Sequence, residues 1–461
     1  MPAIRSTNPF RPGETVAEVE APSAAELGDI VAAAVDSQRR WAASAPERAA
    51  ALNALADAVA AREGLAELIT AEVGKPIAES RGEIARAVAI LRYYSQAALD
   101  PIGELYPASA PRTEVRVRRE PLGVVLTICP WNFPLAIPLW KASPALAWGN
   151  AVVMKPAAAA VGVAAVLGEL CDEVLPAGVL TVANVPGAEL GTLLDDERIA
   201  AATFTGSTSV GMSVAERMAR RAAPAQAEMG GQNPAIVLPD ADPAAAAALI
   251  VAGSMHFAGQ KCTATRRVIA VGDAADAIED ELAAAVEALA VGDPAVEETV
   301  VGPLIDVRAA DEFSERVAAA VGRGSATIAA GTVPGGSPGH FVPPTLLTAD
   351  DPADEVNTEE TFGPLLTLIR VPDAETAVAA ANATRYGLVG AVHGRDVAAA
   401  TTVAGALDCG LIRVNAATPG VDYYAPFGGE RHSSFGPREQ GRAAREFFTT
   451  TRTVTIVSPP D

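Results

Sequence analysis

The sequence "GVVLTICP" at residues 123–130 is a short run of aliphatic and β-branched residues bounded by glycine and proline. Such a run is typical of a strand that is buried on both faces. Similar runs follow it further along the chain, namely "NAVVMKP", "LTVANVPG", "AATFTGS" and "PAIVLPD". The segments between them, such as 160–174 and 187–195, are long enough for crossover helices. Alternating strands and helices predict an α/β fold with a parallel, doubly wound sheet.

A second series of buried runs extends from about residue 265 to residue 415 and consists of "RRVIAV", "PLLTLIRV", "LVGAVHG" and "GLIRVN". The segment from Pro22 to about residue 100 is expected to be mostly helical, because Ser23–Glu26 and Ser44–Glu47 have the spacing of capping boxes. "EVRVRRE" at 114–120 alternates apolar and charged residues, which predicts a strand with one solvated face. The β-branched tail "REFFTTTRTVTIV" predicts a strand near a sheet edge.

Charge and composition exclude several classes of protein. The formal net charge of -21 disfavours nucleic acids and anionic membranes as partners. Residues 122–154 lack the roughly 18 uninterrupted apolar residues of a membrane span, and the start shows no basic region followed by an apolar core. The cysteines and histidines are scattered, so we expect no disulfide framework, no metal site and a reducing cytoplasm. The four cysteines are Cys129, Cys171, Cys262 and Cys409.

Cys262 lies in "HFAGQKCTATRRV" at 256–268. A lone cysteine is usually a small core residue. Here, however, Gly259 precedes it and Thr263 and Thr265 follow it, which indicates tight backbone and polar neighbours in place of an apolar face. Cys262 is therefore a candidate nucleophile, provided that the chain supplies the other groups of a thiol acyl-transfer site.

Two segments supply such groups. Asn132 in "PWNFP" follows the end of the first strand, where ligands bind in open α/β sheets, and its amide could donate to an oxyanion. Glu228 in "AEMGGQNP" precedes two glycines and could act as a base if its pKa is raised. Taken singly, each is better explained without a catalytic role, Asn132 as a turn residue and Glu228 as a surface residue before a Gly-Gly turn.

Two further segments could bind a nucleotide. Gly206 and Ser207 in "ATFTGSTSVG" form a glycine turn at the start of a helix, which is an anion site, although the usual G-x-G-x-x-G spacing is missing. Glu360 and Phe362 in "TEETFGPLL" lie two residues apart, on one face of an extended segment. Together they could hold a ribose and a flat ring, or they could simply form a turn before a strand.

Taken together, these segments resemble the aldehyde dehydrogenase superfamily. The motifs "PWNFPL", "KP" at 155, "FTGSTSVG", "EMGGQNP", "GQKC", "EETFGP" and "PFGGERHSSFG" occur in that family's order between about residues 124 and 441. The resemblance implies a Rossmann-like NAD(P)-binding domain (1–102 and 122–230), an α/β catalytic domain (231–435) and a small β oligomerisation flap (103–121 and 445–461). It also implies a homodimer or homotetramer that acts on a small-molecule aldehyde.

The resemblance also implies roles for the candidate residues. Cys262 would attack the aldehyde carbon to give a thiohemiacetal and, after hydride transfer, a thioester. Asn132 and the Cys262 backbone N–H would hold the oxyanion, and Glu228 would activate the water that hydrolyses the thioester. The implied contacts of the NAD or NADP cofactor are Trp131, Lys155, Gly206, Ser207, Glu360 and Phe362.

Two positions bear on cofactor and substrate. Members that prefer NAD commonly carry Glu three residues after the lysine of "KP", whereas this chain has Ala158, so we expect NADP to be accepted. "GQKCTAT" and "FGPREQGRAAREFFTTTRTV" look most like dehydrogenases of 2-oxoglutarate semialdehyde (2,5-dioxopentanoate). Succinate semialdehyde dehydrogenases usually have Arg where this chain has His256. A succinate semialdehyde type and a broad aldehyde range remain open, and Arg266 and Arg413 are expected only to make structural pairs.

Two other classes of function remain as alternatives. A CoA-acylating or esterase-type relative is disfavoured by Glu228, because CoA acylation has no need of a base for thioester hydrolysis. A binding or structural protein that keeps the fold without the activity is disfavoured by the complete set of Asn132, Glu228, Cys262 and Glu360.

Overall fold

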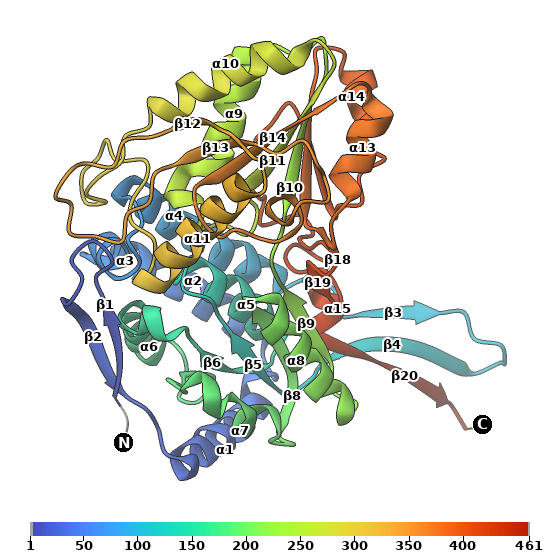
Figure 1. Ribbon diagram of the computed structural model, residues 1–461. Helices are drawn as coiled ribbons and strands as arrows, with labels where there is room; N and C mark the ends of the chain where they lie inside the picture. The colour runs from blue at the N-terminus through green and yellow to red at the C-terminus, as the bar shows by residue number, and fades with distance from the viewer. Residues whose placement is uncertain (1–2, 460–461) are drawn as a thin grey trace.

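The computed structural model describes residues 3–459 and contains two large α/β sheets with a long β arm (Figure 1). The six-stranded sheet has the order β19-β9-β8-β5-β6-β7. Its strands β7-β6-β5-β8-β9 are parallel and follow the 3-2-1-4-5 order of a dinucleotide-binding fold, with β19 antiparallel at the edge. The bounds are β5 Val124–Ile128, β6 Ala151–Lys155, β7 Leu180–Val182, β8 Ile199–Thr205, β9 Ala225–Glu228 and β19 Ser434–Phe435.

Helices cover the six-stranded sheet and form the predicted helical N-terminal region. Ser23 makes the expected capping box with Glu26, and the Ser44 hydroxyl accepts from the Glu47 amide at 3.3 Å. The helical run that starts at 45 breaks at Gly64, which adopts a φ of 73°. The helices are α1 Ala24–Trp41, α2 Ala45–Ala61, α3 Leu65–Val73, α4 Ile77–Ala97, α5 Ala136–Ala147, α6 Val161–Val174, α7 Leu190–Leu194 and α8 Thr208–Arg220. Short 3-10 turns, η1 Ala158–Ala160 and η2 Gly187–Glu189, precede α6 and α7.

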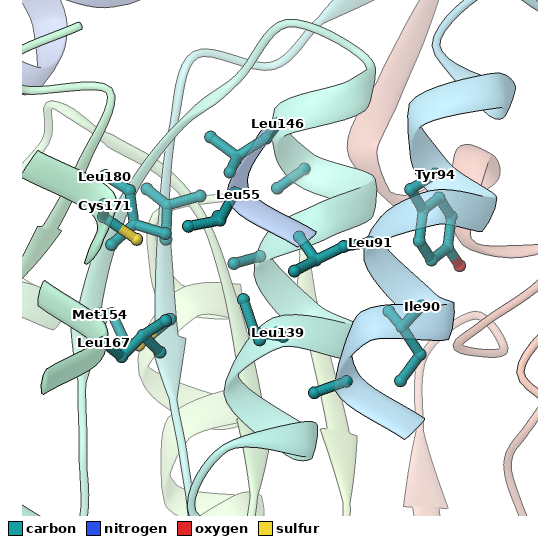
Figure 2. Close-up of a cluster of buried hydrophobic side chains, with 14 of the residues drawn as sticks. Leu55, Ile90, Leu91, Tyr94, Leu139, Leu146, Met154, Leu167, Cys171 and Leu180 are labelled. Carbon is teal, nitrogen blue, oxygen red and sulfur yellow. The ribbon is translucent and has the colours of Figure 1, made fainter. Parts of the chain in front are cut away.

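A buried hydrophobic cluster holds α5 against its neighbours. Figure 2 shows Leu55 of α2, Leu91 of α4 and Leu139 of α5 meeting side chains of α6 and of strands β6 and β7. Leu55, Leu91 and Leu139 are all fully buried. Because α5 starts just after "PWNFP", this cluster fixes the position of the loop that carries Asn132.

The seven-stranded sheet has the order β12-β13-β14-β11-β10-β16-β17 and is parallel except for the antiparallel edge strand β12. The "PAIVLPD" strand, which its apolar pattern groups with the first series, pairs instead with β11 and β16 of this sheet. It lies within 231–435, the range that the resemblance assigns to the catalytic domain. Strand bounds are β10 Asn233–Val237, β11 Thr265–Val271, β12 Thr327–Ala330, β13 Thr345–Thr348, β14 Leu365–Val371, β16 Val389–His393 and β17 Leu411–Val414. Its other elements are α9 Pro243–Met255, η3 His256–Gly259, α10 Ala274–Glu287, α11 Val307–Gly322, α12 Glu355–Thr358, α13 Ala374–Asn382 and α14 Val397–Ala404.

A three-stranded antiparallel sheet projects from the body as an arm (Figure 1). It consists of β3 (Gly103–Tyr106), β4 (Thr113–Pro121) and β20 (Thr449–Val457), so the predicted pairing of "EVRVRRE" with the C-terminal strand is confirmed. The short helix α15 (Ala444–Phe448) leads into β20. Residues 1–2 and 460–461, the extreme ends of the expected cofactor domain and flap, lie outside the described residues.

Smaller elements complete the chain. The hairpin of β1 (Ala3–Thr7) and β2 (Thr15–Glu20) was not expected from the sequence. A short antiparallel pair joins β15 (Tyr386–Gly387) to β18 (Glu430–Arg431), and β18 lies just before β19 in the sequence. Among residues 3–459, no helix is both long and apolar enough to cross a membrane.

The two large sheets meet edge to edge. Strand β9 ends at Glu228 and β10 begins at Asn233, so only four residues connect the carboxyl edge of one sheet to the amino edge of the other. Loops that follow strands of the six-stranded sheet therefore lie opposite loops that precede strands of the seven-stranded sheet. The candidate site lies where these two sets of loops meet.

Candidate active site

Cys262 lies in a tightly turned loop between α9 and β11. Phe257 and Ala258 adopt left-handed conformations with φ of 56° and 51°, which costs energy for side chains other than glycine unless the surroundings hold them. Asn233, at the start of β10, donates through its amide nitrogen to the carbonyls of Cys262 and Ala264, each at 2.8 Å. These bonds fix the main chain on both sides of the thiol.

The surroundings of Cys262 keep its thiol protonated in the isolated protein. Burial raises the pKa of the thiol to about 12, and the nearby carboxylates of Glu360 and Glu228 act in the same direction. The backbone amides of Cys262 and Thr263 oppose this rise. Burial raises the pKa of Cys129 to about 12 as well, so titration alone does not distinguish Cys262. Geometry does, because Cys129 is packed in the core whereas Cys262 lines a cavity.

Asn132 reaches Cys262's loop from the six-stranded sheet. It lies between β5 and α5, and its amide nitrogen donates to the carbonyl of Gln260 at 2.9 Å. The Asn132 side chain is buried, and its carboxamide oxygen has no hydrogen-bond partner among the described residues. One of the two amide hydrogens is thus used within the protein, and the second remains for another acceptor.

A buried ion pair supports the Asn132 loop. The Glu83 carboxylate accepts from the backbone amides of Leu135 and Ala136 at 2.9 Å each, and it also pairs with Lys75. Both side chains of this pair are completely buried, and the Lys75 ammonium lies 3.8 Å from the centroid of the Phe133 ring. The hydrogen bonds from the start of α5 help to offset the desolvation cost of burying this ion pair. They also fix the position of the first residues of α5.

Glu228, the last residue of β9, presents a buried carboxylate to the same site. Burial raises its pKa well above the usual range, and the nearby Glu439 carboxylate contributes further. The Ser434 hydroxyl donates to the Glu228 carboxylate at 2.6 Å and opposes that rise, as do the charges of Lys141 and Arg438. Ser434 lies in the motif "PFGGERHSSFG", where the sequence alone indicates no role for it.

A second buried group of polar side chains lies behind Glu228. Lys141 of α5 donates to the Thr203 hydroxyl at 3.0 Å and to the Phe204 carbonyl at 3.1 Å, and it forms an ion pair with Glu439. The Trp140 indole donates to the other Glu439 oxygen at 2.6 Å. Sequence reasoning missed this group, although a lysine within the apolar helix "AIPLWKASPALA" could have signalled a buried charge.

The candidate cofactor residues of the six-stranded sheet lie along one edge. Lys155 ends β6, Trp131 follows β5, and Gly206 with Ser207 joins β8 to α8, and these strands are adjacent in the order β6-β5-β8. The edge includes the switch point between β5 and β8, where dinucleotides bind in such sheets. The Lys155 ammonium, mostly buried, donates to the Pro156 carbonyl at 2.7 Å.

The turn at Gly206 has the features of a polar cradle. A Cβ atom at Gly206 would lie 2.6 Å from the Phe204 ring, so any side chain there would force the ring to move. The Ser207 side chain makes no capping bond to α8, and the buried hydroxyls of Thr205 and Thr208 have no partner among the described residues. Free donors beside a helix start fit the phosphates of a dinucleotide.

Glu360 and Phe362 approach from the seven-stranded sheet, just before β14. The Glu360 carboxylate accepts from the Gly231 amide at 3.0 Å, and burial raises its pKa. The Phe362 ring meets the Trp131 ring edge to face, with centroids 5.8 Å apart. Residues that were expected to bind one nicotinamide nucleotide thus come together from both sheets.

An apolar cavity of about 400 Å³ leads to Cys262 from another side. Its wall is largely aromatic and aliphatic, and Thr263 and Lys261 adjoin the thiol. Neither Glu228 nor Glu360 lines this cavity. The apolar lining residues include Phe133, Ile137, Trp140, Val421, Tyr423 and Phe427. Cys262 therefore lies between an apolar cavity and a pair of carboxylates, with no group of three or more potential metal ligands in residues 3–459.

Comparison with known proteins shows the family of the chain. Residues 2–454 match the model of the aldehyde dehydrogenase family. The chain is 38% identical to α-ketoglutarate semialdehyde dehydrogenase of Haloferax volcanii over 97% of its length and 94% of that protein. It is 35% identical to α-ketoglutaric semialdehyde dehydrogenase of Bacillus subtilis, over 98% and 94%.

A solved structure extends the comparison to the fold. The betaine aldehyde dehydrogenase of Staphylococcus aureus in complex with NAD⁺ aligns with a TM-score of 0.95 at 28% identity, covering 100% of this chain and 92% of that one. The chain belongs to the aldehyde dehydrogenase family and has its fold.

Proposed function

We propose that this member of the aldehyde dehydrogenase family uses NAD or NADP to oxidise a semialdehyde to the carboxylic acid at Cys262. The observation that carries the proposal is the convergence on one thiol of the Asn132 loop, two buried carboxylates and an apolar cavity. An acyl-transfer reaction needs these groups: a nucleophile, an oxyanion donor, a base and a dry binding space.

Cys262 acts as the nucleophile in this proposal. Its sulfur bonds to the aldehyde carbon and releases its proton to solvent water, while the electron pair of the carbonyl π bond moves to the oxygen, which becomes an oxyanion. The free amide hydrogen of Asn132 and the backbone N–H of Cys262 donate to that oxygen, an arrangement worth about 3–4 kcal/mol for one donor. Bound NAD(P)⁺ supplies the acceptor for the hydride that leaves the carbon, and the product on Cys262 is a thioester.

Glu228 serves as the base for the second half of the reaction. A water molecule attacks the thioester carbon, Glu228 takes a proton from that water, and the carboxylic acid leaves as the Cys262 sulfur regains its electrons. The raised pKa of Glu228 makes it a stronger base than an exposed carboxylate when it is ionised. A base for hydrolysis distinguishes this reaction from transfer of the acyl group to CoA.

The residues at the junction of the sheets fit a nicotinamide dinucleotide. Gly206, Ser207 and the start of α8 would hold its phosphates, and Lys155 the adenosine ribose. Glu360 would hold the nicotinamide ribose beside Trp131 and Phe362, which form an apolar corner. Ala158 is exposed at the start of η1 and presents no carboxylate, so a 2′-phosphate meets no repulsion there.

The proposed substrate is 2-oxoglutarate semialdehyde. The support is the similarity to two relatives named for this substrate at 38% and 35% identity. In addition, burial lowers the pKa of His256, the residue where succinate semialdehyde enzymes usually have Arg. A neutral imidazole would not replace that cation.

Assembly and location complete the proposal. The β arm carries strongly exposed apolar side chains near its ends, including Leu105 and Val457, and its outer strands have free edges (Figure 1). Exposed apolar edges are usually covered by another chain, so we expect a homodimer or homotetramer. The four free, widely spaced cysteines suit a cytoplasmic location. Light scattering coupled to size exclusion checks the assembly.

A panel of aldehydes assayed with NAD and with NADP, each with and without CoA, tests the proposal. We expect reduction of the cofactor without CoA, with the largest kcat/KM for 2-oxoglutarate semialdehyde, and no turnover in Cys262→Ala. Turnover that requires CoA favours the acylating alternative. Equal kcat/KM values across the panel favour a broad aldehyde range, and full activity in Cys262→Ala contradicts the chemistry.

A further inference from the structure

The charges that line the apolar cavity do not cancel. Four side chains that are charged at neutral pH line it, namely Glu79, Glu83, Arg86 and Lys261. Lys261 forms an ion pair with Glu79 at 2.7 Å, and Glu83 pairs with the buried Lys75 behind the wall. Arg86 is left over. Within residues 3–459 its guanidinium forms no ion pair with any carboxylate.

The Arg86 side chain is held in place and keeps donors available. It projects from α4, is half-buried, and donates through one terminal nitrogen to the Val421 carbonyl. Its guanidinium carbon lies 5.8 Å from the centroid of the Tyr423 ring. A guanidinium has five N–H donors, so one backbone bond leaves enough to bind a carboxylate through two of them.

Arg266 and His256, which lie near the site, cannot bind an anionic group of the substrate in place of Arg86. Arg266 is buried and uses its donors on the carbonyls of Gly363, Gly259 and Lys261, so it supports the Cys262 loop, as expected for a structural residue. Burial and the neighbouring charge of Lys261 lower the pKa of His256, which is therefore neutral near pH 7.

The net charge of the whole protein does not favour an anionic substrate. At -21 the long-range field repels an anionic substrate, so an anion can be favoured only by a local cation. Coulombic attraction is stronger beside an apolar wall than in water. An unpaired guanidinium on such a wall, in the cavity that contains Cys262, is the local cation that an acidic aldehyde requires.

We propose that Arg86 binds the distal carboxylate of the substrate and so selects semialdehydes of dicarboxylic acids over neutral aldehydes. This inference rests on the proposed function, because it assumes that the aldehyde end of the same molecule reaches Cys262. Arg86 touches the substrate at the end opposite to the reacting carbon, and its effect falls mainly on KM.

The test compares pairs of aldehydes of similar size in Arg86→Gln and Arg86→Lys. The acidic aldehydes are 2-oxoglutarate semialdehyde and succinate semialdehyde, and the neutral ones are pentanal and methyl 4-oxobutanoate. We expect the ratio of kcat/KM for acidic over neutral aldehydes to fall about 10- to 100-fold in Arg86→Gln, mostly through KM. Arg86→Lys should retain part of the ratio, because it keeps the charge but not the paired geometry.

Arg413→Gln is the matched control. Arg413 donates to the carbonyl of Gly420, next to Val421, but does not line the cavity. It therefore shares Arg86's contact with this loop and lacks its exposure to the substrate. The control should leave the acidic-to-neutral ratio within about twofold. If Arg86→Gln and Arg413→Gln each lower kcat/KM for all four aldehydes by the same factor, Arg86 only anchors the loop and the inference fails.

A second measurement needs no turnover. In the wild-type protein, 2-oxoglutarate should slow the alkylation of Cys262 by iodoacetamide at pH 9, which mass spectrometry measures. In Arg86→Gln, the same protection should need at least about 10-fold more 2-oxoglutarate. If wild type oxidises neutral aldehydes as well as acidic ones, this inference fails while the dehydrogenase function stands. If no aldehyde is oxidised, the proposed function fails, and Arg86-dependent protection alone would still support an anion site.

Discussion

Ser434 donates a hydrogen bond of 2.6 Å to the carboxylate of Glu228, although the two residues are 206 positions apart. The register of the antiparallel pair β9–β19 places them opposite each other at the edge of the six-stranded sheet. The bond favours the ionised carboxylate, whereas burial and Glu439 favour the protonated form. Ser434 thus favours the ionised form of the proposed base.

Replacing Ser434 with Ala should move the acidic limb of the pH profile of kcat to higher pH. Without the hydroxyl, the pKa of Glu228 rises further above its usual value, and a base works only when it is deprotonated. Activity at pH 6 should therefore drop more than activity at pH 9. The measurement is kcat against pH for both proteins. The neighbouring Ser433→Ala, which loses bonds to main-chain atoms only, should leave the limb in place.

Replacing Glu228 with Gln should separate the two halves of the reaction. Hydride transfer precedes the step that needs the base, so one equivalent of NAD(P)H per site should appear in a burst. The steady-state rate should fall about 10²- to 10⁴-fold, the usual contribution of a general base. Stopped-flow absorbance at 340 nm records both phases. Loss of the burst together with the steady state would assign Glu228 to the first half.

The site residues of the first sheet could be predicted from the sequence, because ligands bind at the carboxyl ends of parallel strands and each strand end can be recognised from its own apolar run. Asn132, Lys155, Gly206 and Glu228 each follow or end a strand of the six-stranded sheet. Cys262 lies just before a strand of the other sheet, where that rule assigns nothing. The local residues around Cys262 made it a candidate nucleophile, but its meeting with the strand ends of the first sheet came only from the resemblance to a family, because sequence does not show that two sheets meet edge to edge.

Contacts between distant segments could not be predicted. The "PAIVLPD" strand has the same apolar pattern as the runs before it, so the pattern alone does not show that it pairs with β11 and β16 of the second sheet. Glu439 lies 298 positions from its partner Lys141, and the residues around each give no indication that the two side chains meet. Hydrophobic periodicity indicates which face of a helix or strand is buried. It does not indicate which polar side chains from other elements contact that face.

The Cys262 thiol should react slowly with alkylating agents when no cofactor is bound. Its pKa of about 12 leaves little thiolate at pH 7, so the rate should rise steadily with pH through pH 10. Glu360→Gln removes one of the negative charges that raise this pKa and should speed alkylation at pH 8. The yield of modified Cys262 peptide by mass spectrometry gives the rates. A profile that levels off near pH 8 would contradict the environment described for the thiol.

The buried pair of Lys75 and Glu83 should matter for both stability and turnover. Lys75→Met leaves the Glu83 carboxylate buried without its partner, which costs about 3–5 kcal/mol. It should also lower kcat, because Glu83 positions the loop that carries Asn132. Thermal unfolding followed by circular dichroism measures the first effect. In the double variant Lys75→Met with Glu83→Gln, much of the stability should return, since no isolated charge remains.

A glutamate at position 158 should turn cofactor preference toward NAD. Ala158 is exposed where η1 begins, three residues after Lys155, so a longer side chain fits without disturbing the core. A carboxylate there would repel a 2′-phosphate and could accept from a 2′-hydroxyl, and like charges brought together cost several kcal/mol. The ratio of kcat/KM for NADP over NAD should fall at least about 10-fold in Ala158→Glu. Ala157→Glu, one residue earlier, carries the same charge and should change the ratio much less. Equal ratios in wild type and Ala158→Glu would place the adenosine ribose away from this turn.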